Sequence, residues 1–183
     1  CIERDAFMIA HLKRTPLPRV SHPRITRLQA EIRACGRELH VFELPDDFGA
    51  AAHLALQIDR SGRGPAVCAG LKAGLDPLES AIGAVLETQA TRRYLKKLTR
   101  PRTPVRRRSQ VVDVATRAAF WRPPESVRHL DYLLEGAEAR PLDPRPRRLS
   151  LKGRFFRAVL GRVPGSGVVV KVLAPDLQPL QRV

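Results

Sequence analysis

Two glutamates on separate helical segments are the side chains of this sequence best suited to metal or phosphate chemistry. Glu3 lies in the first turn of one amphipathic segment, and Glu87 interrupts the apolar run 84–88 of another. A carboxylate beside an apolar stripe is costly to bury unless it is paired or binds a cation. If the two converge, they suit Mg²⁺, which prefers a few carboxylates plus nucleotide phosphates, and Arg4 or Arg92 would neutralise those phosphates. Taken alone, Glu87 is more simply interpreted as part of a solvated helix face.

Other catalytic constellations are missing from the sequence. There is no G-x-S-x-G motif, and the five histidines lie apart from one another, which argues against a hydrolase triad. The three cysteines form no C-x-x-C pair and give neither a disulfide framework nor a zinc site. Gly62 and Gly64 could bring the backbone close to a phosphate, but a hairpin turn over 59–64 is the simpler interpretation.

The composition indicates a globular protein with a strong positive charge. The 183 residues are 43% hydrophobic, which is enough to bury one core. A net charge of +15 suggests nucleic acid, but 27 of the 33 basic residues are arginines scattered along the chain, with one dense cluster over 100–108. This distribution argues against a nucleic-acid partner, and a basic nucleic-acid-binding protein is kept only as the second alternative. No apolar run approaches the ~18 residues that span a bilayer, and the cysteine usage is typical of the cytoplasm, so we expect a cytoplasmic protein without a membrane partner.

Hydrophobic periodicity predicts alternating helices and strands. The sequence predicts helices over 1–12, 25–34, 77–98, 123–134 and 149–160. It predicts strands over 38–44, 51–58, 65–70 and 168–173. The longest helix is expected to face inward through Leu78, Ala81, Ile82, Val85, Leu86, Ala90, Tyr94 and Leu95. The last strand is nearly all apolar, which predicts burial on both faces at the centre of a sheet.

These elements predict an α+β fold, with one mixed β-sheet and helices packed on it. Basic, proline-rich linkers near 99–109 and 141–148 are expected to wrap the surface. The first helix begins at residue 1 without a residue that could cap it, which indicates a fragment of a longer protein. We therefore expect a single, incomplete domain over 1–183.

Five stretches, in this order, resemble a YcaO domain. They are 2–7 (IERDAF), 70–81 (GLKAGLDPLESA), Leu86-Glu87 with Arg92, 117–121 (RAAFW) and 170–179 (VKVLAPDLQP). The resemblance covers nearly the whole chain and begins inside the E-x-x-E-R helix of the family. It implies an ATP- and Mg²⁺-dependent enzyme that activates backbone amides of ribosomally made peptides for azoline (thiazoline or oxazoline) or thioamide formation. Such chemistry needs no protein nucleophile, because catalysis rests on positioning and electrostatics.

The resemblance also implies roles for individual residues. Glu3 and Arg4 match the last two positions of E-x-x-E-R and are expected to contact the nucleotide and Mg²⁺. The first Glu of that motif falls before residue 1. Glu87 matches the Glu of the later E-x-x-Q motif and is expected to be a second Mg²⁺ ligand, while Arg92 matches the Arg that follows that motif. The resemblance assigns no catalytic residue.

One departure from the family pattern concerns the E-x-x-Q motif. Ala90 occupies the Gln position, and Gln89 lies one residue early, about 100° around the helix. Either Gln89 substitutes through a shifted turn and contacts the ATP–Mg²⁺ site, or this copy binds metal poorly. A degenerate module that binds a precursor peptide or partner enzyme without using ATP is therefore the alternative function. We expect little turnover from these 183 residues alone, and the implied partners are a precursor peptide and a leader-peptide-binding or sulfur-delivery protein.

Overall fold

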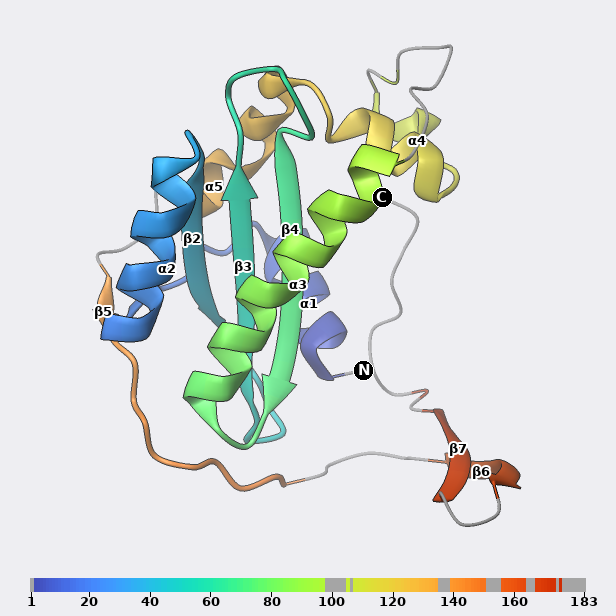
Figure 1. The fold of residues 1–183 in the computed structure, drawn as a ribbon. Coiled ribbons are helices and arrows are strands. Elements are labelled where there is room, and N and C mark those ends of the chain that lie inside the picture. The colour runs from blue at the N-terminus through green and yellow to red at the C-terminus, as the bar shows by residue number, and fades with distance from the viewer. Residues whose placement is uncertain are drawn as a thin grey trace.

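An antiparallel sheet forms the centre of the protein (Figure 1). The computed structural model describes residues 2–97, 105, 107–134, 139–150, 156–163, 167–173 and 175. The strand order is β2-β3-β4, with β2 over Glu38–Leu44, β3 over Ala51–Ile58 and β4 over Val67–Gly74. Val41 pairs with Ala55, and Ala55 pairs with Gly70, which fixes the register of the three strands.

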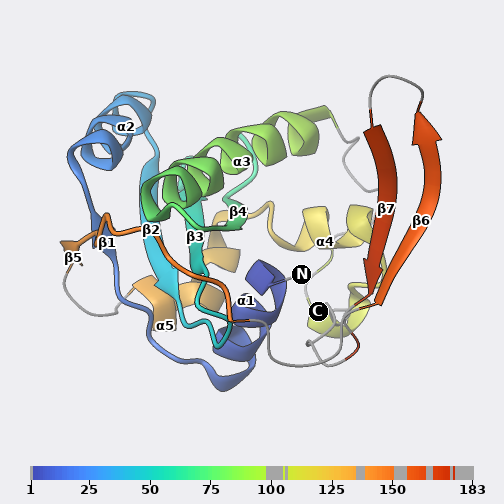
Figure 2. The same ribbon diagram turned by 90° about the horizontal axis from the view of Figure 1, so that it is seen from below.

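Helices cover both faces of this sheet (Figure 1 and Figure 2). One face carries α2 (Pro23–Ala34) and α3 (Pro77–Lys97). The other face carries α1 (Ile2–Lys13), the 3₁₀ helix η2 (Pro124–Leu130) and α5 (Asp131–Leu134). All eight residues of β3 are consequently buried. β3, rather than the C-terminal valine run, is the strand covered on both faces.

The two faces of β3 contribute to separate apolar clusters. Leu54 and Leu56 pack with α1, η2 and α5, whereas Ala55 packs with α2 and α3. On the α3 side the helix lies very close to β4, because a side-chain Cβ at Gly70 would collide with the helix backbone at Ala84 and Thr88. The absence of a side chain at position 70 therefore permits this close approach.

The predicted α+β class is confirmed, and most predicted elements of the first hundred residues are present. The predicted helices and strands up to residue 97 begin and end within four residues of the observed ones. Gly36 and Gly62 adopt positive φ angles of 71° and 72°, which suit the turns that follow α2 and β3. Within the described residues, no helix combines the length and apolarity that crossing a membrane requires.

Shorter elements complete the described chain. β1 (Val20–Ser21) pairs in parallel with β5 (Arg140–Pro141). The 3₁₀ helix η1 (Arg108–Gln110) precedes α4 (Val114–Phe120), whose N-terminus is closed by a capping box between Asp113 and Thr116. Of the predicted linker near 99–109, residues 99–104 and 106 lie outside the described residues.

The segment 139–150 is extended after β5. The backbone N–H of Arg147 donates to the Leu75 carbonyl oxygen at 2.7 Å, and the N–H of Ser150 donates to the Phe48 carbonyl oxygen at 2.6 Å. These bonds hold the predicted linker 141–148 against the end of the sheet where β2 turns into β3.

The C-terminal part differs from the prediction. The predicted helix over 149–160 is wrong, because residues 156–160 belong to β6 (Phe156–Val163), which pairs antiparallel with β7 (Gly167–Leu173). The predicted strand over 168–173 exists as β7, but it lies in a two-stranded hairpin, and Val172 is 47% exposed. Valine favours a strand in either setting, so an apolar run does not distinguish a hairpin from a central strand.

The buried face of α3 matches the predicted stripe at Ala81, Ile82 and Val85 and differs from it at other positions. Leu86, Ala90 and Tyr94 were expected to face inward and are exposed. Polar residues lie on the buried face in their place: Ser80, Thr88 and Arg92. Each has a hydrogen-bond partner there, as when the Thr88 hydroxyl donates to the Val85 carbonyl oxygen at 2.7 Å. Polar side chains can therefore line this interface without losing their hydrogen bonds.

Candidate active site

Glu87 stands at the edge of the sheet, beside β4. Its Oε2 accepts a hydrogen bond from the backbone N–H of Leu71 at 2.9 Å. Leu71 belongs to β4, which is the edge strand of the sheet within the described residues, and Glu87 itself is exposed. A carboxylate has about four lone-pair sites, so this bond orients the group and leaves positions for a cation. The geometry is compatible with a metal ligand.

Glu3 and Arg4 lie in the first turn of α1, on the face of the sheet opposite α3 (Figure 2). Glu3 is half-buried. Both helices contact β4, one from each face. Glu3 and Glu87 can therefore share an ion only around the edge of β4. The described residues contain no group of three or more His, Cys, Asp or Glu side chains suited to a metal ion.

Gln89 lies on the flank of α3 opposite Glu87. Successive helical residues turn by about 100°, so Gln89 is rotated by about 200° from Glu87. Its flank also carries Ile82, which packs with the residues of α2. Ala90 is rotated by about 300°, which brings it within about 60° of Glu87, and it is exposed. The side of α3 that bears Glu87 therefore carries a methyl group where the family motif has an amide.

Arg92 is buried against the hairpin that joins β3 to β4. Its Nη2 donates to Asp59 Oδ2 at 2.5 Å, and its Nη1 donates to the Pro65 carbonyl oxygen at 3.1 Å. The side chains of Arg92 and Asp59 are only 10% and 5% exposed. Burial opposes ionisation of Asp59, but hydrogen bonds from Ser61 and Arg92 outweigh it, so the pKa of Asp59 is lowered from its usual value. Arg92 is therefore engaged with the protein itself.

Asp59 was missed by reasoning from the sequence. An available signal was its position directly after a strand and two residues before Ser61, which is typical of an Asx turn. Ser61 confirms that geometry, because its N–H and its hydroxyl donate to Asp59 Oδ1 at 3.0 and 2.5 Å. The partner Arg92 lies 33 residues further along the chain, so sequence spacing does not pair the two.

His53 forms a second buried polar contact beneath α3. Its Nδ1 lies 3.1 Å from the Ser80 hydroxyl, which donates to the Ala51 carbonyl oxygen at 2.7 Å. Because the hydroxyl proton is used there, the network assigns His53 Nδ1 as the donor to Ser80. His53 Nε2 has no partner among the described residues. Burial, aided by the positive charge of Arg147, lowers the pKa of His53 to about 4, so the ring is neutral near pH 7.

A cavity of about 360 Å³ lies at the other end of the sheet from Asp59. It is bounded by residues 15–18, the β2–β3 turn and two arginines, one of which, Arg147, forms an ion pair with Glu43 at 3.2 Å. The predicted site residues whose side chains the structure describes do not line this cavity. The described side chains of Glu3, Glu87, Gln89 and Arg92 therefore do not belong to this cavity.

The chain belongs to the YcaO family. The family model, which describes ATP- and Mg²⁺-binding YcaO cyclodehydratases, matches residues 1–178. This match confirms the resemblance carried by the five sequence stretches. ATP and Mg²⁺ are the cofactors of the family by that description.

Solved structures share the fold over nearly the whole chain. A heterocyclase in complex with substrate and cofactor is 22% identical with a TM-score of 0.72, and the match covers 97% of this chain and 25% of that one. The YcaO from Methanopyrus kandleri bound with AMPPCP and Mg²⁺ is 19% identical with a TM-score of 0.63, over 94% and 48% of the two chains. The E. coli microcin synthetase McbBCD complex with pro-MccB17 bound is 14% identical with a TM-score of 0.62, over 96% and 49%. At identities of 14% to 22%, this similarity shows that the chain shares the fold of these structures.

The chain spans between 25% and 49% of the length of these solved chains. A sequence comparison with curated proteins finds no match. The roles assigned to the five candidate residues stay predictions.

Proposed function

We propose that this chain is part of an enzyme that uses ATP and Mg²⁺ to dehydrate backbone amides of a ribosomally made peptide. The observation that carries the proposal is the carboxylate of Glu87, held at the edge of β4 by the Leu71 N–H, in a chain that matches a cyclodehydratase family over residues 1–178. A Cys, Ser or Thr side chain of the substrate would add to the preceding carbonyl carbon. ATP would supply the phosphoryl group with which the carbonyl oxygen leaves, so that the products are an azoline, ADP and phosphate.

The candidate residues fit Mg²⁺ in kind and in number. Mg²⁺ prefers oxygen ligands and usually takes one or two carboxylates from the protein, while waters and phosphates fill its other positions. We assign these two carboxylates to Glu3 and Glu87, and we assign Arg4 to the nucleotide phosphates. The roles of Gln89 and Arg92 as nucleotide contacts are supported by the resemblance alone.

The work of this chain would be to position groups rather than to supply a nucleophile. Glu87 is held by a backbone N–H, which the pairing of β4 with β3 keeps in place. A ligand oriented in this way needs little reorganisation when the metal and nucleotide arrive.

Thioamide formation is an alternative product of the same amide activation, with sulfide adding in place of the substrate side chain. The proposed partners are a precursor peptide and a leader-peptide-binding or sulfur-delivery protein, in the cytoplasm. The microcin synthetase neighbour, a complex with pro-MccB17 bound, supports a peptide substrate.

A degenerate module that binds a peptide or partner enzyme without turning over ATP is the second candidate function. The observation that favours it is the position of Gln89 on the flank of α3 that packs toward α2, with Ala90 on the side of Glu87. In that case the metal shell would lack the amide that the family motif supplies.

The test measures the ATP-dependent mass change of the cognate peptide with the complete protein. We expect wild-type protein to remove one water per modified residue. Glu3→Gln and Glu87→Gln should each lower the rate by at least about 100-fold, because each removes a charge that holds Mg²⁺.

Glu79→Gln is the matched control. Glu79 lies on α3 and pairs with Arg24 at 3.1 Å on the exposed surface, so its loss should leave the rate unchanged. Full activity in both site variants would show that the site assignment is wrong. Peptide binding by wild-type protein without ATP consumption would instead support the binding module.

A further inference from the structure

A buried ion pair ties α3 to the β3–β4 hairpin close to the proposed metal ligand. Arg92 follows Glu87 by five residues on α3, and its guanidinium donates to Asp59 at 2.5 Å and to the Pro65 carbonyl oxygen at 3.1 Å. We infer that Asp59 is a positioning residue, which through Arg92 holds α3 against β4 and so sets the position of Glu87 for Mg²⁺. The inference rests on the proposed function.

The carboxylate of Asp59 is fixed on its own hairpin as well as by the helix. Its Oδ1 accepts from the Ser61 N–H at 3.0 Å and from the Ser61 hydroxyl at 2.5 Å, while its backbone N–H donates to the Ala66 carbonyl oxygen at 2.8 Å. Asp59 therefore uses Oδ1 to close the turn and Oδ2 to hold Arg92. A carboxylate that is already ordered loses little conformational freedom when it holds the helix.

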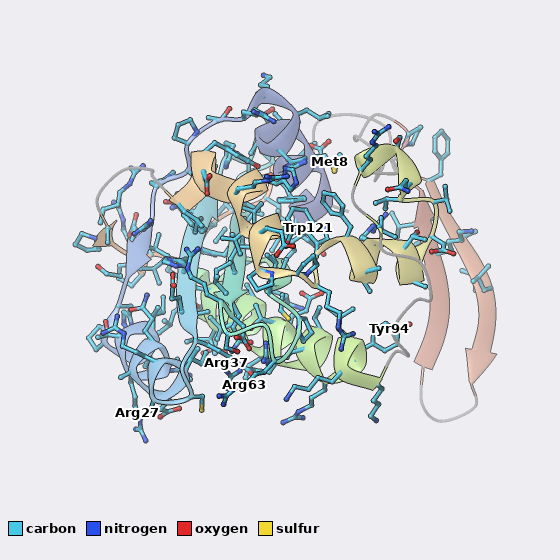
Figure 3. The ribbon with its side chains drawn as sticks, turned by 90° about the horizontal axis from the view of Figure 1, so that it is seen from above. Met8, Arg27, Arg37, Arg63, Tyr94 and Trp121 are labelled. Atoms are coloured by element: carbon cyan, nitrogen blue, oxygen red, sulfur yellow. The ribbon has the colours of Figure 1, made fainter. Side chains whose placement is uncertain are left out.

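The hairpin is shaped to receive the guanidinium. Gly64 is buried beneath Arg92, and a Cβ at that position would lie 2.9 Å from Arg92 Nη2. The arginines of the hairpin itself, Arg60 and Arg63, are exposed, and Arg63 lies at the molecular surface (Figure 3). The cation in this contact thus comes from the helix, which is the arrangement needed to fix the helix on the hairpin.

Glu87 lies between two points at which α3 is held. On its N-terminal side, Gly70 allows the helix backbone at Ala84 to lie against β4 so closely that no Cβ fits between them. On its C-terminal side, Arg92 is held by the hairpin. A helix fixed at one point can pivot, and a pivot would move Glu87 away from the Leu71 N–H. Two fixed points remove this freedom, and a ligand held in place binds metal more tightly.

The burial of the pair also indicates that Arg92 acts indirectly. Only 8% of Arg92 is exposed. To reach a phosphate, the guanidinium would have to leave Asp59 as an unpaired buried carboxylate, which is strongly unfavourable. Arg92 is therefore better placed to hold the helix than to contact the nucleotide.

The experiment measures the Mg²⁺ concentration that half-saturates ATP binding to the complete protein, together with kcat at saturating Mg²⁺. Asp59→Asn keeps the size of the side chain and removes its charge. We expect it to raise the Mg²⁺ midpoint about 10-fold and to leave kcat within about twofold of wild type. Arg92→Met should also raise the Mg²⁺ midpoint, and the double variant should raise it no more than the worse single variant does, because the two residues act as one unit. Arg92→Lys keeps the positive charge and should raise the Mg²⁺ midpoint less than Arg92→Met does.

Two further variants keep the result interpretable. Glu79→Gln removes an exposed ion pair from the same helix and should leave the Mg²⁺ midpoint unchanged. Gly64→Ala keeps both charges but crowds the guanidinium, and should raise the midpoint about threefold or more even if a variant of the pair fails to fold. Circular dichroism of each variant establishes that it is folded.

Unchanged midpoints in Asp59→Asn and Gly64→Ala, in a background where wild-type protein binds ATP with Mg²⁺, would overturn the inference. Loss of ATP binding in Arg92→Met with normal behaviour in Asp59→Asn would also overturn it, because Arg92 would then contact the nucleotide directly. If wild-type protein binds no ATP in the presence of Mg²⁺, the proposed function fails first and the inference fails with it.

Discussion

Acid should destabilise this fold through His53. The residue is fully buried in β3, and burial, with a smaller contribution from the charge of Arg147, lowers its pKa from 6.5 to about 4. In the unfolded chain the imidazole regains its ordinary pKa. Between the two pKa values the unfolded chain binds more protons than the folded protein, so the free energy of unfolding falls as the pH falls.

The expected loss is about 2 kcal/mol between pH 7 and pH 5 and about 3 kcal/mol by pH 4. Well below pH 4 both states carry the proton, and His53 causes no further loss. The cost arises mainly at Nε2, which in the charged ring would carry a proton without an acceptor among the described residues. Nδ1 keeps its contact with Ser80 at 3.1 Å in either state.

Urea unfolding at pH 7, 6 and 5, followed by circular dichroism, measures this loss. His53→Asn isolates it, because Asn keeps a donor near the position of Nδ1 but does not titrate. Burial also lowers the pKa of His40, which contributes in the same pH range to wild type and variant alike. The difference between wild type and His53→Asn in the pH dependence of the free energy of unfolding therefore measures the contribution of His53. If wild type and His53→Asn lose stability in parallel between pH 7 and pH 5, the reasoning is refuted.

Two substitutions test the packing between β3, β4 and α3. Gln57→Leu should raise the free energy of unfolding by about 1 kcal/mol, because both polar atoms of this buried side chain are unpartnered among the described residues. A lower free energy of unfolding in urea would show instead that the amide is hydrogen-bonded in solution. Gly70→Ala should lower it by about 3 kcal/mol, because the new Cβ collides with the helix backbone at Ala84. The control Gly161→Ala meets no described atom within 4 Å and should change it by less than about 0.5 kcal/mol; equal costs at both glycines would contradict the close approach.

Local patterns were sufficient to predict β2 and the position of α3. β2 runs over the predicted residues because its apolar side chains alternate with polar ones along most of Glu38–Leu44. α3 begins at Pro77, where a missing N–H costs nothing, and the Asp76 carboxylate accepts the N–H of Glu79 at 2.9 Å. Such signals act over a few residues, which is the range that a sequence pattern can report.

Buried polar contacts could not be predicted, because their partners are distant along the chain. His53 meets Ser80 across 27 residues, and Asp59 meets Arg92 across 33. A polar residue at an inward helical position looks like a surface residue until its partner is known. The predicted stripe of α3 therefore includes the buried Ala81, Ile82 and Val85, but it also runs through exposed residues such as Leu86 and omits the buried polar residues.

Ala90, where the family motif has Gln, lies on the exposed side of α3 about 60° from Glu87. Its small side chain therefore leaves no buried cavity and costs the fold little stability. The carboxylate of Glu87 is oriented by the Leu71 N–H at 2.9 Å, and this donor belongs to the backbone of β4 rather than to a neighbouring helix side chain. A backbone donor is set by strand pairing and does not depend on residue 90. If Glu87 holds Mg²⁺ as proposed, the change to Ala would leave the orientation of Glu87 in place, and that orientation would depend on how firmly α3 is held on β4.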